Sequence, residues 1–298
     1  MKKLLFTGAS GFLGNNTRPI LERLYDVCTV GLTDMDDIKS NLAAGVPPIN
    51  KHFDVVLHAA GKAHSVPKTD EEKQLFYDVN YQGTINLCKA LEKVGVPESF
   101  VFISTVAVYG CESGEMITEE HTLDGTSPYA ESKKKAEEFL ANWCDENGVI
   151  LGVLRPSLLA GRDAPGNLGA MVSGIKRGLY FNIAGGKGRK SILMAEDIAY
   201  LLPLIANKGG IYNVCDDYNP SFGEISKFIA KQLGKREPFS IPYWVAWCLA
   251  KIGDRIGRSA PINTSRLAKM TMSLTFSNEK AKRELRWTPM DVLTNYIL

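Results

Sequence analysis

The chain has 298 residues, of which 45% are hydrophobic and 23% are charged, and its formal net charge is +2. This composition excludes intrinsic disorder, which needs far fewer apolar side chains or a much larger net charge. Near-neutrality also argues against a dedicated nucleic-acid binder. The net charge conceals an acidic first half and a basic second half. Residues 1–150 carry 14 Lys or Arg against 22 Asp or Glu, and residues 151–298 carry 21 Lys or Arg against 11 Asp or Glu.

The N-terminus, MKKLLFTGAS, has a basic start, but its apolar run breaks at Thr7-Gly8 and is too short for a secretory signal. No segment approaches the roughly 18 apolar residues of a membrane-spanning helix. The six cysteines are scattered without a C-x-x-C pair, which favours free thiols over a disulfide framework or a metal site. We therefore expect a cytoplasmic protein that binds no metal.

Short apolar, β-rich runs alternate with longer helical patterns in the first half of the chain. The strands are predicted at residues 3–7, 26–30, 54–59, 100–104 and 150–155, and the helices at 15–24, 71–92 and 128–147. The strands lack polar alternation, so both of their faces are expected to be buried. This pattern predicts an α/β fold with a Rossmann-type doubly wound parallel sheet.

The alternation of strands and long helices ends after about residue 160, where Gly/Pro-rich loops separate shorter helices. We predict a dinucleotide-binding Rossmann domain over residues 1–160 and a smaller substrate-binding lobe over residues 161–298. One strand near residues 210–215 is expected to return to the sheet.

The turn after the first strand reads TGASGFLG over residues 7–14. Its glycines, Gly8, Gly11 and Gly14, permit a tight turn and a close approach of the backbone to a pyrophosphate. The following helix offers free N–H groups and the positive end of its dipole to the phosphates. A simple tight turn is the alternative, but the position between the first strand and the first helix favours a dinucleotide site.

The second strand lacks the acidic residue that usually binds the adenosine ribose at its end. It reaches Gly31, and Asp34, Asp36 and Asp37 follow on a predicted loop. The missing acid removes the group that repels a 2′-phosphate, and no Arg replaces it to attract one. NAD and NADP both remain open.

Tyr129 and Lys133 are four residues apart, on one face of a predicted helix that Ser127 caps and Pro128 begins. A phenol with a pKa of about 10 is a poor base. A lysine ammonium about 4 Å away favours the phenolate by about 4 kcal/mol at an effective dielectric of about 20. The pair suits the acid/base step of alcohol oxidation or ketone reduction. The alternative is a solvated helix surface, since Lys133 is followed by two more lysines.

Six motifs together resemble the extended short-chain dehydrogenase/reductase superfamily, specifically its nucleotide-sugar epimerase/dehydratase group. They are TGASGFLG (7–14), HAAG (58–61), the Asn80 of DVNYQGT, ISTVAVYG (103–110), SPYAESK (127–133) and LRP (154–156). They follow the order of the family over nearly the whole chain, and their combination is specific although most of them are weak alone.

The resemblance implies that Tyr129 is the acid/base, that Lys133 binds the nicotinamide ribose and lowers the pKa of Tyr129, and that Thr105 orients the substrate oxygen. The residues expected to bind the coenzyme are Gly8, Ser10, Gly11, Phe12, Leu13, Gly14, His58, Ala59, Ala60, Gly61, Asn80, Ser104, Tyr129, Lys133 and Pro156. The family also suggests a homodimer formed through the helices that carry Asn80 and Tyr129.

The pair Val106-Ala107 stands where the 4,6-dehydratases carry Asp-Glu, so a dehydratase is disfavoured. Two reactions remain, both using hydride transfer and an acid/base. The favoured one is an NAD(P)-dependent epimerisation at C4 of a UDP-sugar with Tyr129 as acid/base, and the alternative is an NADPH-dependent 4-keto-sugar-nucleotide reductase. The short stretch before HAAG resembles enzymes of polysaccharide pathways. A non-catalytic coenzyme-binding regulatory protein is the alternative of another class, and the intact Thr/Tyr/Lys set argues against it.

Residues 151–190 hold seven Lys or Arg and one acid, Asp163. Such a cluster matches the diphosphate of a nucleotide sugar. Asn167 resembles a nucleotide-contacting Asn of the family, and Arg189 and Lys190 are the other expected substrate-binding residues. Solvated surface charge is the alternative for each of them.

Two further segments carry hypotheses. Residues 242–257 combine Trp244 and Trp247 with basic side chains, and we favour a lobe helix that packs its aromatic rings on the body over one that lies on a membrane surface. The loop at residues 112–124 has five acidic residues and no basic one, so it is expected to face the basic half.

Overall fold

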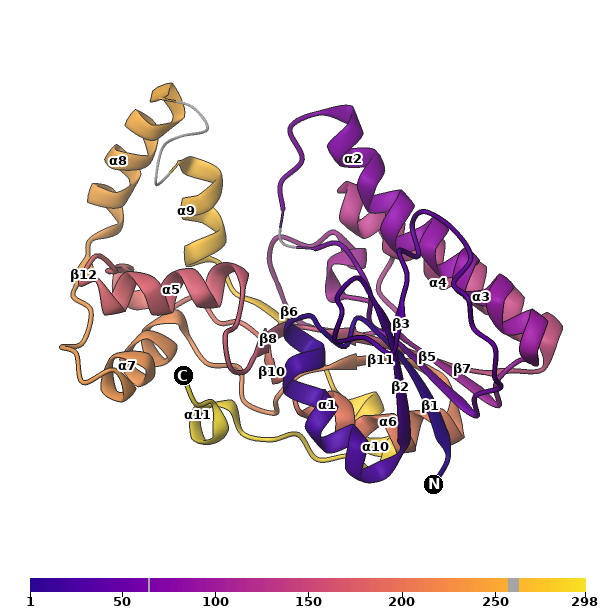
Figure 1. Ribbon diagram of the computed structural model, residues 1–298. Coiled ribbons are helices and arrows are strands. Elements are labelled where there is room, and N and C mark those ends of the chain that lie inside the picture. Colours follow the sequence, from indigo (N-terminus) through magenta and orange to yellow (C-terminus); the bar gives the residue numbers. More distant parts are fainter. Residues whose placement is uncertain (64, 257–262) are drawn as a thin grey trace.

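The computed structural model describes residues 1–63, 65–256 and 263–298 (Figure 1). The strands are β1 (Lys3–Thr7), β2 (Asp26–Gly31), β3 (Ile38–Lys39), β4 (Val55–His58), β5 (Ser99–Ile103), β6 (Gly114–Ile117), β7 (Ile150–Pro156), β8 (Leu158–Ala160), β9 (Asn182–Ile183), β10 (Ile192–Met194), β11 (Gly210–Val214), β12 (Ser240–Ile241) and β13 (Leu274–Phe276). The α-helices are α1 (Phe12–Leu24), α2 (Asp70–Tyr77), α3 (Gly83–Val94), α4 (Pro128–Asn147), α5 (Gly166–Lys176), α6 (Asp197–Lys208), α7 (Phe222–Gln232), α8 (Tyr243–Ile256), α9 (Thr264–Thr271), α10 (Glu279–Leu285) and α11 (Val292–Asn295). A π-helical turn, η1 (Asp78–Gln82), and two 3₁₀ turns, η2 (Val106–Tyr109) and η3 (Ala184–Gly186), complete the elements of the described part of the chain.

The central sheet has seven parallel strands in the order β11-β7-β5-β4-β1-β2-β3. Each of the five predicted strands begins and ends within one residue of the observed one. The order reverses beside β1, which pairs with both β2 and β4, so the ligand-binding crevice of a doubly wound sheet is expected at the carboxyl end of β1. The predicted α/β class and doubly wound parallel sheet are confirmed.

Helices cover both faces of the sheet, with α2, α3 and α4 on one side and α1, α6 and α10 on the other (Figure 1). Successive strand residues point to opposite faces, so Leu4 and Phe6 pack with α6 whereas Leu5 packs with α3 and α4. All three side chains are buried, which is why the strands show no polar alternation.

The helix predicted over residues 71–92 is formed by α2, η1 and α3 in an unbroken run. The wider π-helical turn lies in the middle of this run and contains the buried Asn80. π-helical turns of this kind frequently occur at functional sites.

The second half of the chain contributes to both parts of the molecule. β11 pairs in parallel with β7 at the edge of the sheet, and α6 and α10 pack on its face. The helices α5, α7, α8 and α9 form a body beside the sheet (Figure 1). The aromatic side chains of α8 were expected to pack inward, and this expectation is wrong, since Trp244 is 70% exposed. The side of the helix that packs on α9 carries only small residues, so the aromatic rings lie on the exposed side. Gly257, the last residue of that predicted segment, lies outside the described residues.

The acidic loop contacts the basic half, as expected. β6 lies within this loop and pairs with β13, and the Lys269 ammonium is 3.3 Å from the Glu112 carboxylate. Backbone pairing carries most of this contact, and one ion pair at an exposed site adds little to it.

A buried ion pair connects α4 with β7. The Arg155 guanidinium donates to both carboxylate oxygens of Glu137, at 2.5 and 3.2 Å. Arg155 also donates to the Tyr109 hydroxyl, and the Ser104 hydroxyl donates to Glu137, so the charges are surrounded by hydrogen-bond partners. A buried pair with complete partners positions its elements, and the loss of one member leaves an isolated buried charge.

The substitution Arg155→Met should lower the free energy of unfolding by about 3–5 kcal/mol, because Glu137 loses its buried counter-ion. The double substitution Arg155→Met/Glu137→Leu should recover much of this loss, and Lys2→Met, which breaks the exposed pair with Glu98, should change stability by less than about 1 kcal/mol. Denaturant titration measures all three. An Arg155→Met variant that is no less stable than Lys2→Met would contradict this account.

Candidate active site

The glycine loop lets the backbone of β1 turn sharply into α1. Gly8 has a φ of +78°, and a Cβ there would lie 2.6 Å from the Ala60 amide nitrogen. A Cβ on Gly14 would overlap the backbone of Ala9, so this glycine lets α1 pack tightly on the loop. The N-cap of α1 is Gly11, which offers no side-chain cap, and the first turn has no acidic residue. The free N–H groups and the dipole at this end fit a pyrophosphate.

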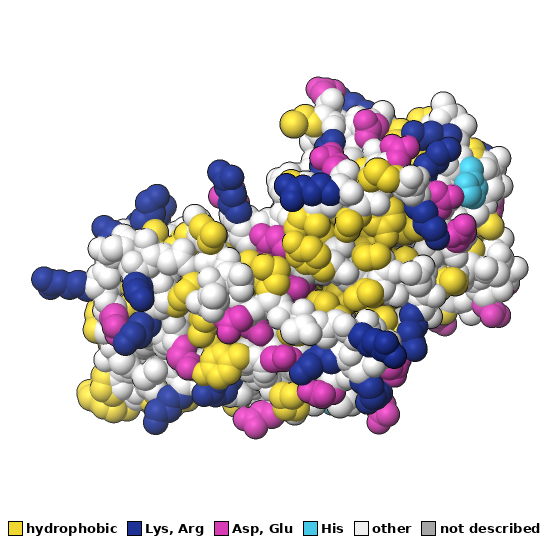
Figure 2. Space-filling view, turned by 90° about the horizontal axis from the view of Figure 1, so that it is seen from below, with side chains coloured by type: hydrophobic (Ala, Val, Ile, Leu, Met, Phe, Trp, Pro, Cys, Tyr) yellow, Lys and Arg dark blue, Asp and Glu magenta, His cyan; other side chains and the backbone are white. Residues whose placement is uncertain are grey.

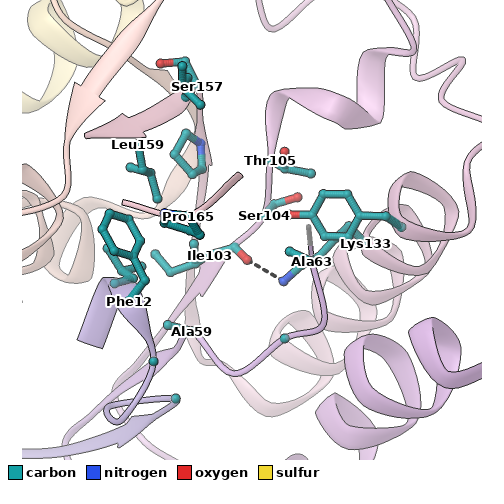
Figure 3. Close-up of a pocket in the computed structure, with 17 residues that line it drawn as sticks. Phe12, Ala59, Ala63, Ile103, Ser104, Thr105, Lys133, Ser157, Leu159 and Pro165 are labelled. Atoms are coloured by element: carbon teal, nitrogen blue, oxygen red, sulfur yellow. Dashed lines mark hydrogen bonds between the residues drawn. The ribbon is translucent and has the colours of Figure 1, made fainter. Parts of the chain in front are cut away.

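A cavity of about 390 Å³ opens beside this loop (Figure 3). Phe12 and Leu159 lie on one side of it, and Thr105 and Lys133 on the other. The predicted site residues that line it are Gly8, Gly11, Phe12, Leu13, Ala59, Gly61, Ser104, Thr105, Tyr129, Lys133 and Pro156. The structure thus brings the glycine loop, the end of β5 and the start of α4 to one cavity.

The start of α4 places Tyr129 and Lys133 on the wall of this cavity. The Ser127 hydroxyl caps the helix by accepting from the Ala130 N–H, and Pro128 occupies the first turn, as predicted. Thr105 follows β5, and its hydroxyl accepts from the Ala107 N–H, which fixes the turn η2.

The electrostatics of Tyr129 and Lys133 differ from the simple pair that the sequence suggested. Burial raises the pKa of the Tyr129 phenol, and the opposing influence is a hydrogen bond with Thr105. The Lys133 ammonium donates to the Ile103 carbonyl at 2.7 Å and lies over the Phe102 ring. Burial lowers the pKa of Lys133 to about 7, against the raising effect of Glu137. A lysine with this pKa is only partly charged near neutrality, so it lowers the pKa of the phenol less than a full ammonium would.

His58 supports the site from behind the cavity. It is fully buried, and its ring nitrogens lie 2.6 Å from the Thr7 hydroxyl and 2.9 Å from the Thr84 hydroxyl. Thr84 donates its own proton to the Asn80 carbonyl, so it accepts from Nε2, and Nδ1 then accepts from Thr7. Burial and the nearby charge of Lys133 lower the pKa of His58 to about 3, so the ring stays neutral.

Asn80 holds the loop that follows β4. Its side chain accepts from the Lys62 N–H and donates to the Lys62 carbonyl and the Ser132 hydroxyl. This fixes Gly61, which lines the cavity, against the start of α4. The predicted coenzyme residues that do not line the cavity are Ser10, Gly14, His58, Ala60 and Asn80.

Several lining residues were missed from the sequence. They are Ala63, Ile103, Ser157, Leu158, Leu159 and Pro165. The Ser157 hydroxyl is buried and has no hydrogen-bond partner within the described part of the chain. Ser157 follows β7, and the rule that ligands bind at the carboxyl ends of parallel strands could have identified it.

The expected substrate residues lie outside the cavity. Asn167 is exposed in the first turn of α5. The Arg189 guanidinium donates to the Asn219 carbonyl at 2.7 Å, and the Lys190 ammonium lies over the Phe222 ring. Figure 2 shows Lys and Arg side chains standing out at both ends of the face that it draws.

Asp36 folds back over the end of β2. Its Oδ2 accepts from the Thr33 N–H and hydroxyl, at 3.0 and 2.7 Å, and its buried Oδ1 has no hydrogen-bond partner among the described residues. A Cβ on Gly31 would lie within 2.6 Å of both carboxylate oxygens. The carboxylate therefore occupies the space that a side chain at the end of β2 would take, and glycine is required there to leave room.

Comparison with known proteins gives one family and several relatives. The NAD dependent epimerase/dehydratase family matches residues 4–215. The N-acetyl-alpha-D-glucosaminyl-diphospho-ditrans,octacis-undecaprenol 4-epimerase of Escherichia coli O157:H7 is 28% identical over 300 residues, which cover 93% of this chain and 88% of the relative. The GDP-6-deoxy-D-mannose reductase of Pseudomonas aeruginosa is 28% identical over 252 residues, which cover 77% of this chain and 79% of the relative.

A solved structure agrees in fold. The UDP-glucose 4-epimerase of Thermotoga maritima, crystallised with UDP-glucose, is similar with a TM-score of 0.73 and 19% identity over 99% of this chain and 96% of that one. The family match covers most of the chain and includes the glycine loop, the end of β5 and the helix of Tyr129, so this protein belongs to the NAD-dependent epimerase/dehydratase family.

Proposed function

We propose that the protein is an NAD-dependent epimerase that inverts C4 of a sugar carried on a diphosphate, with a UDP-sugar as the first substrate to test. The observation that carries this proposal is the placement of Thr105, Tyr129 and Lys133 on a cavity whose opposite wall is the glycine loop. The epimerase and reductase among its relatives support the same class of reaction.

A bound nicotinamide coenzyme supplies the position that accepts hydride from the sugar carbon and returns it. The residues of the chain move the proton. The Tyr129 oxygen takes the proton of the C4 hydroxyl and later gives it back, and the Thr105 hydroxyl stabilises the phenolate by donating to it.

Lys133 adjusts the basicity of Tyr129. Its pKa of about 7 leaves it poised between the neutral and charged forms. The negative charge of a diphosphate in the cavity favours the ammonium, and the ammonium in turn lowers the pKa of the neighbouring phenol. Ligand binding thus prepares the base.

One observation narrows the reaction. Val106 and Ala107, beside Thr105, provide no carboxylate for the elimination of water, which disfavours a dehydratase. The alternative is an NADPH-dependent reductase of a 4-keto-sugar nucleotide. An epimerase recycles its coenzyme and a reductase exchanges it, so NAD that stays bound through purification supports the first, and an empty site supports the second.

A second candidate substrate is a sugar diphosphate attached to a polyprenyl lipid, as the name of the Escherichia coli relative states for that protein. The exposed apolar face of α8 favours it, because a lipid-linked substrate requires the enzyme to work at a membrane. The same proton chemistry applies, since the reacting sugar and its diphosphate are alike in both substrates.

For the coenzyme, we propose that Asp36 takes the place of the missing acid at the end of β2. Within the described residues one oxygen of its carboxylate has no hydrogen-bond partner, and the carboxylate occupies the position where a side chain on Gly31 would lie. A carboxylate there accepts hydrogen bonds from the diol of an adenosine ribose and repels a 2′-phosphate. This favours NAD over NADP.

The substitution Tyr129→Phe should reduce turnover by at least about 10²-fold, because it removes the acid/base, while coenzyme affinity stays within about threefold. Tyr200→Phe, at an exposed tyrosine on α6, is the control. The assay offers UDP-sugars and 4-keto-UDP-sugars with NADH and NADPH. Undiminished turnover in Tyr129→Phe would overturn the mechanism, and tight coenzyme binding without turnover of any substrate by the native protein would favour a regulatory protein.

The native protein should bind NADH at least about 10-fold more tightly than NADPH, since hydrogen bonds to a charged group contribute about 1.5–3 kcal/mol. Asp36→Asn should remove most of this preference. Asp34→Asn, at an exposed carboxylate on the same loop, should preserve it. Calorimetric titration with NAD, NADH, NADP and NADPH measures the ratio of the affinities. Equal affinity of the native protein for NADH and NADPH would refute the role of Asp36.

The substitution Lys133→Met should stabilise the fold at low pH. Burial lowers the pKa of this lysine from 10.5 to about 7. Between these pH values the unfolded chain keeps a proton that the folded chain loses, which destabilises the fold. This destabilisation reaches its full size below pH 7. The unfolding temperature of Lys133→Met should exceed that of the native protein at pH 6, and the difference should shrink by pH 10. Lys135→Met, at an exposed position of α4, should shift it equally at both pH values. A difference for Lys133→Met that does not depend on pH would contradict this account.

A further inference from the structure

The helix α8 buries small residues and exposes large apolar ones, which is the reverse of an ordinary surface helix. Its buried residues are the small Ala246, Ala250 and Gly253, which lie on one side. Its large apolar residues are exposed, namely Tyr243, Trp244, Trp247, Leu249, Ile252 and Ile256, with exposed fractions between 44% and 70%. A surface helix normally turns its large apolar side chains to the core.

The exposed apolar side chains of α8 and its exposed basic ones occupy the sides of the helix away from its buried stripe, and this surface is called the α8 patch. The helix stands at the outer end of the lobe in Figure 1, beside α9. Phe239, just before the helix, adds another apolar ring that is 64% exposed. Several large apolar side chains exposed on one element of a folded protein usually mark an interaction site.

Basic side chains lie in the middle of this patch. At 100° per residue, Lys251 and Arg255 fall within about 20° of Trp244 around the helix axis, opposite the buried stripe. Both are exposed, and the Lys251 ammonium lies over the Trp247 ring at 5.5 Å. The one acidic residue of α8, Asp254, accepts from the Thr264 N–H and hydroxyl and is thereby directed to α9.

We propose that α8 docks on the surface of an anionic lipid bilayer. Tryptophan and tyrosine rings favour the boundary between headgroups and acyl chains, and lysine and arginine extend their apolar stems there while their charges reach the lipid phosphates. No helix within residues 1–63, 65–256 and 263–298 is long and apolar enough to cross a membrane, so the contact is with the surface.

The charges argue against a second copy of the chain as the occupant. In a twofold-symmetric contact the same patch meets itself, so Lys251 and Arg255 would approach their own counterparts. Charged residues are depleted from the cores of such interfaces. A bilayer with anionic headgroups has the opposite charge and imposes no such conflict.

This inference deepens the proposed function in one respect, because a face that binds lipid favours the lipid-linked candidate substrate. It does not depend on catalysis, since vesicle binding needs neither substrate nor coenzyme. Loss of turnover in Tyr129→Phe with intact vesicle binding would separate the two.

The test is flotation of the full chain with vesicles of phosphatidylcholine alone or of phosphatidylcholine with 30% phosphatidylglycerol. At low salt we expect binding to the mixed vesicles at least 10-fold stronger than to the neutral ones, with a decline as salt increases. A polarity-sensitive fluorophore on Cys248, an exposed cysteine of α8, should shift to the blue on binding.

Two variants separate the contributions of the patch. Trp244→Ser/Trp247→Ser should weaken binding to mixed vesicles at least 10-fold, and Lys251→Gln/Arg255→Gln should remove the preference for anionic lipid. Leu179→Ser, at a 73% exposed leucine elsewhere on the lobe, is the matched control and should bind as the native protein does. Coenzyme titration verifies that each variant is folded.

Absence of vesicle binding at low salt overturns the proposal, as does binding that both double variants retain. Light scattering that shows a dimer in the native protein and a monomer in Trp244→Ser/Trp247→Ser, without vesicle binding, assigns the patch to a second copy instead.

Discussion

The ion pair between Glu137 and Arg155 sets the position of α4 against the sheet, and the site depends on this position. Tyr129, Lys133 and Glu137 follow one another at intervals of one turn along the same face of α4. Glu137 is held by Arg155 of β7 and by Ser104, the residue after β5, so the helix has one angular setting against the sheet. With the third residue fixed, the first two necessarily face the cavity. The pair is therefore a positioning device, and its two charges are tolerated in the interior because each has several partners.

The second constraint is the close approach of backbones around β1. Gly8 lies against Ala60, and Gly14 lies against Ala9, so neither position has room for a side chain. Behind them, Thr7, His58, Thr84 and Asn80 form a hydrogen-bonded series that fixes the loop after β4. The polar groups of this series are buried and mutually satisfied, and none of these four residues lines the cavity.

The sequence predicted what local patterns determine. The strand limits followed from apolar runs, and the start of α4 followed from Ser127 and Pro128, because caps and prolines act within a few residues of their own position. It did not predict that the Asp36 carboxylate lies against Gly31, that the Lys133 ammonium donates to the Ile103 carbonyl, or that Ser157 lines the cavity. Each of these depends on how a loop or side chain meets a neighbour that the local pattern does not specify. The orientation of α8 was wrong for a related reason: hydrophobicity alone favoured burial of the tryptophans, and only the packing of Ala246 and Ala250 on the lobe decides which side is covered.

The return of β11 to the sheet has a consequence for motion. The chain leaves the sheet after β7, returns for α6 and β11, leaves again, and returns once more for α10. Several covalent crossings thus join the lobe to the sheet, and a hinge that swings on one or two linking segments is not available to a molecule connected in this way. The width of the cavity is held by these crossings, so entry and exit of a ligand must use small sliding movements of packed elements or rearrangements of short loops at its rim.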